Sequence, residues 1–205
     1  MRAQGFGFGL VLGVLVTWVS AQWLSPAAGK NLPESPCIPA ATAADYVHSV
    51  IQADRTFYTT EIVERMQVRG TAVASEHWKE RGTLPLPAQF LKEAGLLMRG
   101  DDRGVRVRLL SLWPINKDNR PHTDFERTGL SELTGAGGRP YTGLVTEDGA
   151  SYFQALYPDK AVSQTCVGCH NAHPNSPKKD FKQHDVMGGI LVTMPLAQIG
   201  QKPQR

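Results

Sequence analysis

The chain has 205 residues, of which 41% are hydrophobic and 20% are charged, and its formal net charge is +3. This length suits one ordinary globular domain with a short appendage, and the composition excludes both a disordered chain and a polytopic membrane protein. The basic residues are scattered, and no run of five like charges occurs, so we expect no nucleic-acid partner.

Residues 1–24 have the pattern of an export segment. The start, MRAQ, carries one positive charge, and an uncharged apolar run follows from Gly5 to Leu24. Such a run is typical of a signal peptide, and it is also long enough to span a bilayer as a helix. We therefore predict export to the periplasm or another extracytoplasmic compartment. The segment is either cleaved, with a suitable site before Gln22, or retained as a membrane anchor.

A linker and one folded domain are expected after the export segment. Residues 25–39 are rich in Pro, Gly, Ala and Ser, which is typical of a linker. The domain is expected over residues 40–200, with 201–205 as a tail. Its first element is a predicted helix over residues 41–68, because apolar side chains recur there mainly every four residues and most charged side chains lie outside that stripe.

The next elements are short. Pro87 suits the first turn of a second helix, since proline lacks the N–H that an interior position would use. The valines and arginines of VRVRLL then alternate, which predicts a strand with one solvated face. Thr123 and Glu126 have the spacing of a capping box, and they predict a helix that reaches about Leu133.

The last third of the chain has the pattern of an antiparallel sheet. YTGLVT, EDG and SYFQALYP predict a hairpin with a tight turn, and DVMGGILVTMPL predicts a final strand. Gly188 and Gly189 within that strand indicate a bulge or the close approach of something flat. Helices followed by strands joined through hairpins predict an α+β fold built on an antiparallel sheet.

Cys166, Cys169 and His170 form a C-x-x-C-H run, which is the most specific chemical signal in the chain. Two thiols at this spacing can each add to one vinyl group of a haem, and the histidine that follows can reach the iron. The predicted export agrees with this, because c-type haem is attached outside the cytoplasm. We expect one covalent haem c, held by Cys166 and Cys169 with His170 as the proximal iron ligand.

Other uses of the motif are less well supported. A zinc site would need four ligands, and Cys166, Cys169, His170 and His173 are crowded into eight residues rather than two separated pairs. A thioredoxin-type dithiol belongs in a βαβ context, which the predicted elements lack. A disulfide across two intervening residues is sterically awkward.

The sixth ligand of the iron is a separate question, and Cys37 is the first candidate. It lies just before the N-terminus of the predicted long helix, where the helix dipole and free N–H groups lower a thiol's pKa and favour thiolate. A thiolate ligand would stabilise ferric iron and lower the potential. The alternatives are His184 at the start of the last strand, a methionine, or an open position, and Cys37 would then be an inert or intermolecular thiol.

The other histidines fit the iron less well. His173 lies too close to His170 to reach the opposite face of the haem, and the remaining three are interpreted as surface or structural residues: His48, His77 and His122. Arg55 and Tyr58 lie about one helical turn apart and could meet a haem propionate, although a solvated position is the simpler interpretation of Arg55.

Several segments in the same order resemble the mono-haem PAS-like cytochrome domain family. They are ADYVHSVIQADRTFYTTEIVER, LPLPAQFLKEAG, RLLSLWPINKDNRPHTDFE and CVGCHNAHPNSPKKDFKQHDVMGGILVTMPL. The resemblance covers about residues 40–196. The family was long labelled a domain of unknown function, and it occurs both as a stand-alone exported cytochrome and as the extracytoplasmic sensor part of bacterial receptors.

The resemblance implies a PAS-like antiparallel sheet flanked by helices, with c-type haem at Cys166, Cys169 and His170. It also implies that a cysteine ahead of the first helix can act as the distal ligand, a position that Cys37 matches. One departure is His184, which stands before Asp185 where the family usually has a Gly-Asp pair.

We therefore expect an exported mono-haem c-type cytochrome that transfers electrons to a redox partner protein or membrane complex. The alternative is a haem-based sensor that signals through a partner protein, in which a diatomic gas such as CO or NO displaces Cys37. The chain ends at Arg205 without a kinase or methyl-accepting module, which favours the carrier. We expect no enzymatic activity, since a peroxidase-like site would need an open iron and distal acid–base groups.

Overall fold

The computed structural model describes residues 37–99, 104–135 and 138–196. The chain divides into two units, residues 1–37 and residues 38–205, and all the described helices and strands belong to the second. The predicted signal or anchor helix at 1–24 lies outside the described residues. None of the described helices is long and apolar enough to cross a membrane.

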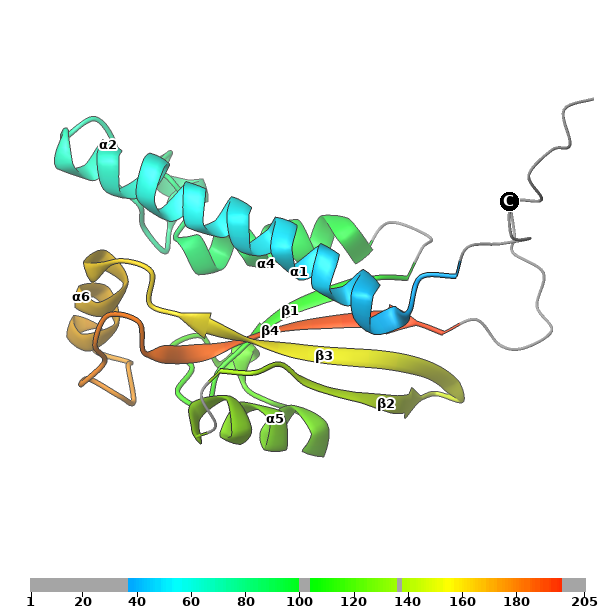
Figure 1. The fold of residues 1–205 in the computed structure, drawn as a ribbon. Helices are drawn as coiled ribbons and strands as arrows, with labels where there is room; N and C mark the ends of the chain where they lie inside the picture. The colour runs from blue at the N-terminus through cyan, green and yellow to red at the C-terminus, as the bar shows by residue number, and fades with distance from the viewer. Residues whose placement is uncertain (1–36, 100–103, 136–137, 197–205) are drawn as a thin grey trace, which may run out of the picture. The chain divides into compact units, whose positions relative to one another are not determined.

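A four-stranded antiparallel sheet forms the centre of the domain, with helices on both faces (Figure 1). The strand order is β1-β4-β3-β2. The strands are β1 (Arg106–Leu110), β2 (Tyr141–Glu147), β3 (Ala150–Lys160) and β4 (Val186–Pro195). Helices α1 (Ala40–Phe57) and α4 (Pro87–Arg99) lie on one face, and α5 (Asp124–Gly135) lies on the other. The predicted α+β fold with an antiparallel sheet is confirmed.

Two hydrophobic clusters, one on each face, hold these layers together. The residues of β3 and β4 alternate between them, because neighbouring side chains of a strand point to opposite faces. Ala155, Tyr157, Ile190 and Val192 pack under α1 and α4, whereas Leu156 and Leu191 pack with the leucines of α5. The two central strands are therefore buried on both faces, which explains their nearly continuous apolar sequence.

The predicted hairpin closes through a two-residue turn. Glu147 pairs with Ala150, and the residues between them, Asp148 and Gly149, have φ values of 51° and 78°. Positive φ at both central positions is characteristic of the type I′ turn, whose twist matches that of the flanking strands. The Asp-Gly pair therefore sets the register of β2 on β3.

The long helix predicted over residues 41–68 is helical throughout but not uniform. After α1 it widens into a π-helical segment, η1 (Tyr58–Glu64), and it ends as α2 (Arg65–Val68). The hydroxyls of Thr59 and Thr60 donate to carbonyls four residues earlier, and such bonds, with a run of β-branched residues, disturb a regular helix. A four-residue apolar spacing cannot reveal this change of winding.

Gly188 and Gly189 lie where β4 meets its neighbours most closely. A Cβ at Gly188 would lie 2.2 Å from the carbonyl oxygen of Leu110, and one at Gly189 would lie 2.8 Å from Cδ1 of Leu156. The pairing of β3 with β4 is irregular between Asp159 and Lys160, beside Gly188. The predicted bulge or close approach is thus explained by neighbouring strands and side chains of the sheet itself.

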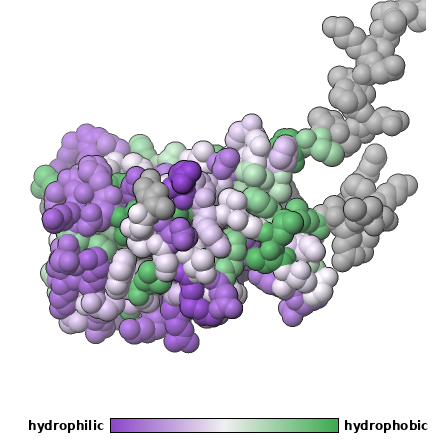
Figure 2. Space-filling view, turned by 60° about the horizontal axis from the view of Figure 1, so that its bottom comes forward, coloured by the Kyte–Doolittle hydropathy of each residue, from purple (hydrophilic) through white to green (hydrophobic). Residues whose placement is uncertain are grey.

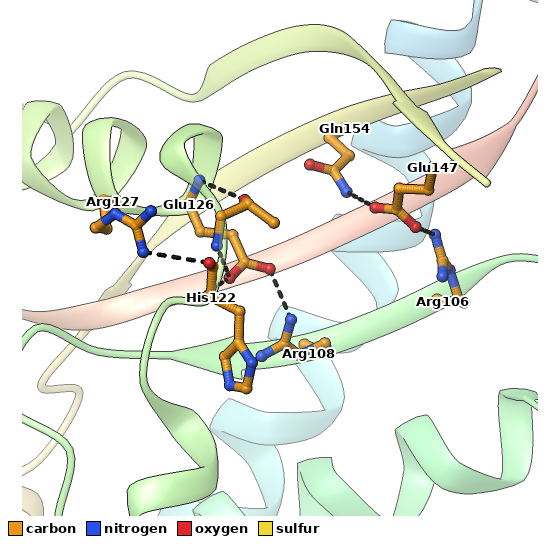
Figure 3. Close-up of polar contacts among 8 residues, drawn as sticks. Arg106, Arg108, His122, Glu126, Arg127, Glu147 and Gln154 are labelled. Carbon is orange, nitrogen blue, oxygen red and sulfur yellow. Dashed lines mark hydrogen bonds and ion pairs between the residues drawn. The ribbon is translucent and has the colours of Figure 1, made fainter. Parts of the chain in front are cut away.

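The predicted capping box at the start of α5 also attaches that helix to the sheet (Figure 3). The Thr123 hydroxyl accepts from the Glu126 N–H, and Oε2 of Glu126 accepts from the N–H groups of His122 and Thr123. Oε1 of Glu126 lies 2.6 Å from Nη1 of Arg108 on β1, and the Glu126 side chain is only 2% exposed. Glu126 is therefore both the capping residue of α5 and the buried partner of an ion pair with Arg108.

Glu126→Gln is expected to destabilise the domain by about 1–3 kcal/mol, because it leaves Arg108 without its buried counter-charge. Chemical denaturation measures the change. The matched control is Glu147→Gln, since Glu147 pairs with Arg106 at 2.6 Å with its side chain one-third exposed. That change should cost less than about 1 kcal/mol. Equal losses in the two variants would contradict the role given to burial.

Candidate functional site

A cavity of about 490 Å³ lies between the long helix and a short helix near the C-terminus, α6 (Gln164–Ala172). Its volume is within the range of cofactor and ligand pockets. Arg55, Thr59 and Val63 line it from the long helix, and Cys166, Cys169 and His170 line it from α6. Figure 1 shows α6 at one end of the sheet, beyond the arrowhead of β3.

The C-x-x-C-H run forms part of α6. The Ser163 side chain caps the helix by accepting from the Cys166 N–H at 3.4 Å. Cys166 and the two residues three and four positions later, Cys169 and His170, lie on the same side of a helix at this spacing. All three border the cavity, so the structure brings the predicted thioether anchors and the predicted proximal ligand together.

Two contacts fix α6 against the rest of the domain. The Thr165 hydroxyl donates to Glu64 at the end of the π-helical segment, at 2.9 Å. Asn171 bonds the backbone of Phe181 twice, donating to its carbonyl at 2.9 Å and accepting from its N–H at 3.0 Å. The ring of Phe181 in turn stands edge-on to His170, with centroids 6.0 Å apart. The orientation of α6 is therefore set from both of its ends.

His170 is held as a neutral base. Burial lowers the pKa of His170, and the nearby charge of Arg55 lowers it further. A neutral imidazole is the form that binds a metal. Its Nδ1 atom is buried and has no hydrogen-bond partner among the described residues. A buried, unpartnered ring nitrogen in a cavity wall fits a residue that serves a bound group.

The two cysteines are free thiols, and Cys169 remains protonated at neutral pH. Partial burial of its thiol raises the pKa of Cys169, and the negative charge of Glu76 raises it further. Cys166 packs against a small cluster of Ala161, Phe181 and Met187. The described residues contain no group of three or more His, Cys, Asp or Glu side chains placed to hold a metal ion, as a structural zinc site would require.

Arg55 is buried, contrary to the solvated position that its sequence suggested. Its guanidinium faces the Asp159 carboxylate at 2.9 and 3.0 Å, and the two side chains are 9% and 7% exposed. Burial raises the pKa of Asp159, and the charge of Arg55 opposes that shift. Both residues line the cavity, and Nε of Arg55 is buried without a partner in the described part of the chain. A free cationic N–H there suits an anionic group such as a propionate.

Tyr58 lies elsewhere. Its hydroxyl donates to the Pro85 carbonyl at 2.7 Å, and its ring stacks on Phe90 with centroids 4.4 Å apart. Tyr58 is not among the residues that line the cavity, so the structure does not bring it to the site. It joins the long helix to α4 instead.

His173 and His184 differ in their relation to the cavity. His173 lines it, with Nε2 3.1 Å from Glu76 and Nδ1 accepting the Asn175 N–H at 3.1 Å, so both ring nitrogens are occupied. His184 does not line the cavity, and its backbone N–H donates to the Ala161 carbonyl. The structure does not bring His184 to the site.

The other three histidines also lie outside the cavity lining. His48 is half-buried and stacks on Tyr157 at 3.9 Å, so it is not the surface residue that we expected. His77 is exposed near Glu80, and the backbone N–H of His122 bonds Glu126.

The backbone at His184 has a conformation that glycine adopts more easily than histidine. The φ angle of His184 is 71°, in the left-handed region that glycine adopts without strain. A histidine there carries a modest backbone cost. The turn at His184 is therefore less stable with histidine than it would be with glycine.

His184→Gly is expected to stabilise the domain by about 0.5–1 kcal/mol by removing that cost. The midpoint of urea unfolding measures the gain. His77→Gly is the matched control, because His77 is exposed and has a φ of −97°. The control should be neutral or destabilising, and a gain of the same size in both variants would contradict the backbone explanation.

Cys37 is exposed and ends the first unit of the chain, and it is not among the cavity-lining residues. Two residues lie between it and Ala40, a span of at most about 10 Å. From Ala40 to Arg55, the first cavity residue on α1, the helix rises about 22 Å. Cys37 as the sixth ligand therefore stays a prediction.

The surface changes character along the domain. Figure 2 shows mainly hydrophilic residues at the end that carries α6, on the left as in Figure 1, and more hydrophobic residues towards the other half. Lysines and acidic residues follow α6 in the sequence, among them Lys178, which pairs with Asp180. The cavity therefore lies at the more polar end of the domain.

The fold and site together define a small α+β domain in which a C-x-x-C-H helix borders a cavity at one end of an antiparallel sheet. A family model described as "Tll0287-like: Tll0287" matches residues 36–195. The chain belongs to the Tll0287-like family, which confirms the family resemblance seen in the sequence.

Among solved structures, the crystal structure of the cyanobacterial heme-protein Tll0287 matches at 19% identity. The match covers 55% of this chain and 71% of that chain with a TM-score of 0.38, too low for it to add to the family match. No curated protein matches the chain.

Proposed function

We propose that this protein is an exported cytochrome that holds one covalent haem c in the cavity beside α6. The observation that carries the proposal is the placement of Cys166, Cys169 and His170 together on the wall of a cavity of about 490 Å³. Family membership supports it, since the cyanobacterial Tll0287 is itself described as a heme-protein. The apolar segment at 1–24 supports the proposed extracytoplasmic location.

Each residue of the site has a distinct role in the proposal. Cys166 and Cys169 would hold the macrocycle through thioether bonds, and His170 would bind the iron through its neutral ring. Arg55 would face a propionate, with Asp159 keeping the guanidinium in place. The bound haem supplies reversible one-electron chemistry, and the protein's contribution is to bind it, orient it and limit its contact with water.

Electron transfer to a redox partner protein or membrane complex is the primary function that we propose. Cys169 is exposed, so one edge of a haem attached there would lie near solvent. The hydrophilic surface around that end suits a transient encounter, because weak redox complexes rely on polar and charged contacts more than on a large apolar interface.

A sensory function is the second candidate, and one observation favours it. The π-helical segment lines the cavity through Thr59 and Val63, and it continues directly from α1. Irregular helical turns of this kind occur often at functional sites. A diatomic gas that displaced the sixth ligand would act next to this segment, which could pass the change along the helix to a partner protein.

The haem proposal predicts a pigment that survives acid-acetone extraction and gives a c-type pyridine haemochrome, with one haem per chain. Cys166→Ser combined with Cys169→Ser should yield protein without covalent haem. The matched control is His173→Ala, which removes a cavity histidine whose two nitrogens already have partners and should retain the pigment. Haem that is extracted from the wild-type protein would contradict the covalent attachment.

Cys37→Ala tests the sixth ligand. If a thiolate from Cys37 binds the ferric iron, its removal should shift the ferric Soret band and raise the midpoint potential by on the order of 100 mV or more. Ultraviolet–visible spectra and a redox titration measure both. An unchanged spectrum and potential would remove Cys37 from the site and leave a cavity-lining residue such as Met187, or an open position.

Binding of CO and NO to the wild type and to the Cys37→Ala variant distinguishes a carrier from a sensor. A carrier should keep six-coordinate iron when reduced and should ignore CO and NO, whereas a sensor should bind one of them at low concentration. Wild-type protein that binds neither gas, beside a Cys37→Ala variant that binds both, would identify Cys37 as the ligand of a carrier. Tight binding of a gas by the wild type would replace the carrier proposal with the sensor.

A further inference from the structure

Nδ1 of His170 lacks, among the described residues, the hydrogen bond that usually orients a metal-binding histidine. Such a histidine normally donates the N–H of its other ring nitrogen to a carbonyl or carboxylate, and that bond fixes the plane of the ring. The torsion that turns an imidazole about its Cβ atom is otherwise broad. Another contact is therefore needed to hold the His170 ring in one plane.

The ring of Phe181 lies against the ring of His170 and supplies such a contact. The two ring centroids are 6.0 Å apart, and the planes are nearly perpendicular at 89°. Perpendicular pairs with centroids about 4.5–7 Å apart are a favoured geometry of aromatic side chains. Phe181 is only 3% exposed. A buried ring in this position restricts the rotation of the imidazole.

Asn171 ties Phe181 to the residue that follows His170 in the chain. Its side-chain amide donates to the Phe181 carbonyl at 2.9 Å and accepts from the Phe181 N–H at 3.0 Å. The amide thus meets both backbone groups of one residue, as the opposite residue of a paired strand does. The position of the Phe181 ring is therefore set relative to the helix that carries His170.

Two further side chains hold the Phe181 ring in place. Trp113 lies against it, with centroids 5.8 Å apart and planes at 75°. Nζ of Lys178 lies 5.0 Å from the Phe181 centroid and 5.5 Å from the Trp113 centroid, which is the geometry of a cation–π contact. Ala161 and Met187 pack with Phe181 in a small buried cluster. A ring that is fixed on several sides can fix the ring beside it.

Phe125 shows the position of an aromatic residue that serves packing alone. Its ring lies 4.9 Å from the ring of Tyr141, and both pack on the leucine cluster beneath α5. Neither residue lines the cavity. Phe181 does not line the cavity either, but its ring meets His170, which does. Phe181 can therefore act on the site through His170.

We propose that Phe181, held by Asn171, is the positioning residue that sets the plane of the His170 ring at the iron. This inference rests on the proposed haem site and adds to it a residue outside the cavity wall. The plane of an axial imidazole determines which iron orbitals it overlaps, so a change of plane alters the electron paramagnetic resonance (EPR) spectrum of ferric haem.

The EPR spectrum of the ferric, haem-loaded protein tests the proposal. The wild type should give one set of g values, because its His170 ring has one orientation. Phe181→Leu removes the aromatic ring and keeps most of the apolar volume. It should give shifted or multiple sets, since loss of the aromatic contact reduces the preference for one orientation by a factor of about two to ten. Phe181→Tyr keeps the ring and should resemble the wild type.

Phe125→Leu is the matched control, because it makes the same substitution at an aromatic pair away from the cavity. It should lower the midpoint of unfolding and leave the g values unchanged. Asn171→Ala keeps the Phe181 ring but removes both bonds to its backbone, and it replaces Phe181→Leu as the test if that variant does not fold. Wild-type g values in Phe181→Leu or, in its place, in Asn171→Ala would overturn the proposal. An equal change in Phe125→Leu would also overturn it, because the effect would then follow from lost packing.

A measurement on haem-free protein separates this inference from the proposed function. In the Cys166→Ser, Cys169→Ser protein, the ring current of Phe181 should shift the proton resonances of the His170 ring. Phe181→Leu should remove that shift, and Phe125→Leu should not. Wild-type protein without covalent haem would overturn the proposed function, whereas the ring-current shift would still show that Phe181 holds His170. Unchanged His170 resonances in Phe181→Leu would overturn the positioning role even in a protein that binds haem.

Discussion

The buried ion pair between Arg55 and Asp159 determines where the cavity begins. It joins the long helix to the end of β3 across 104 positions of sequence, with both side chains almost completely out of water. Removing two charges from water is costly, and the cost is recovered only when the geometry of the pair is good. The pair therefore fixes the helix to the strand at one point, and beyond that point the two diverge and leave room between them.

The residues on either side of this pair lead directly into the two walls of the cavity. One turn after Arg55 the helix changes to its π-helical form and presents Thr59 and Val63. Just after Asp159 the strand ends, Ala161 bonds the backbone of His184 and Asp185, and Ser163 starts α6. Two backbone hydrogen bonds at Ala161 thus join the two ends of the segment that carries the C-x-x-C-H run. The segment that carries the C-x-x-C-H run is therefore a closed loop between the two central strands, β3 and β4.

Much of the fold could be predicted from local patterns in the sequence. The strand β1, the Asp-Gly turn and the capping box at Glu126 each depend on residues close together in the chain, and each is found in the structure, although Arg108 on the expected solvated face of β1 pairs with buried Glu126. The π-helical segment and the burial of Glu126 and Arg55 were not predicted. The two side chains are buried because each pairs with a residue outside its own helix, Glu126 with Arg108 and Arg55 with Asp159. The periodicity of the neighbouring sequence cannot indicate such a pairing.

The closed loop has a consequence for how the chain tolerates change. Because its two ends are neighbours in the sheet, the register of β3 on β4 is set by the hydrophobic clusters and not by the length of the segment between them. The entropic cost of closing a loop rises only with the logarithm of its length. Residues can therefore be inserted between Asn175 and Phe181 at little cost to the sheet, and the surface that a partner meets can diverge while His173, Asn175 and the bonds of Asn171 to Phe181 keep the cavity wall in place.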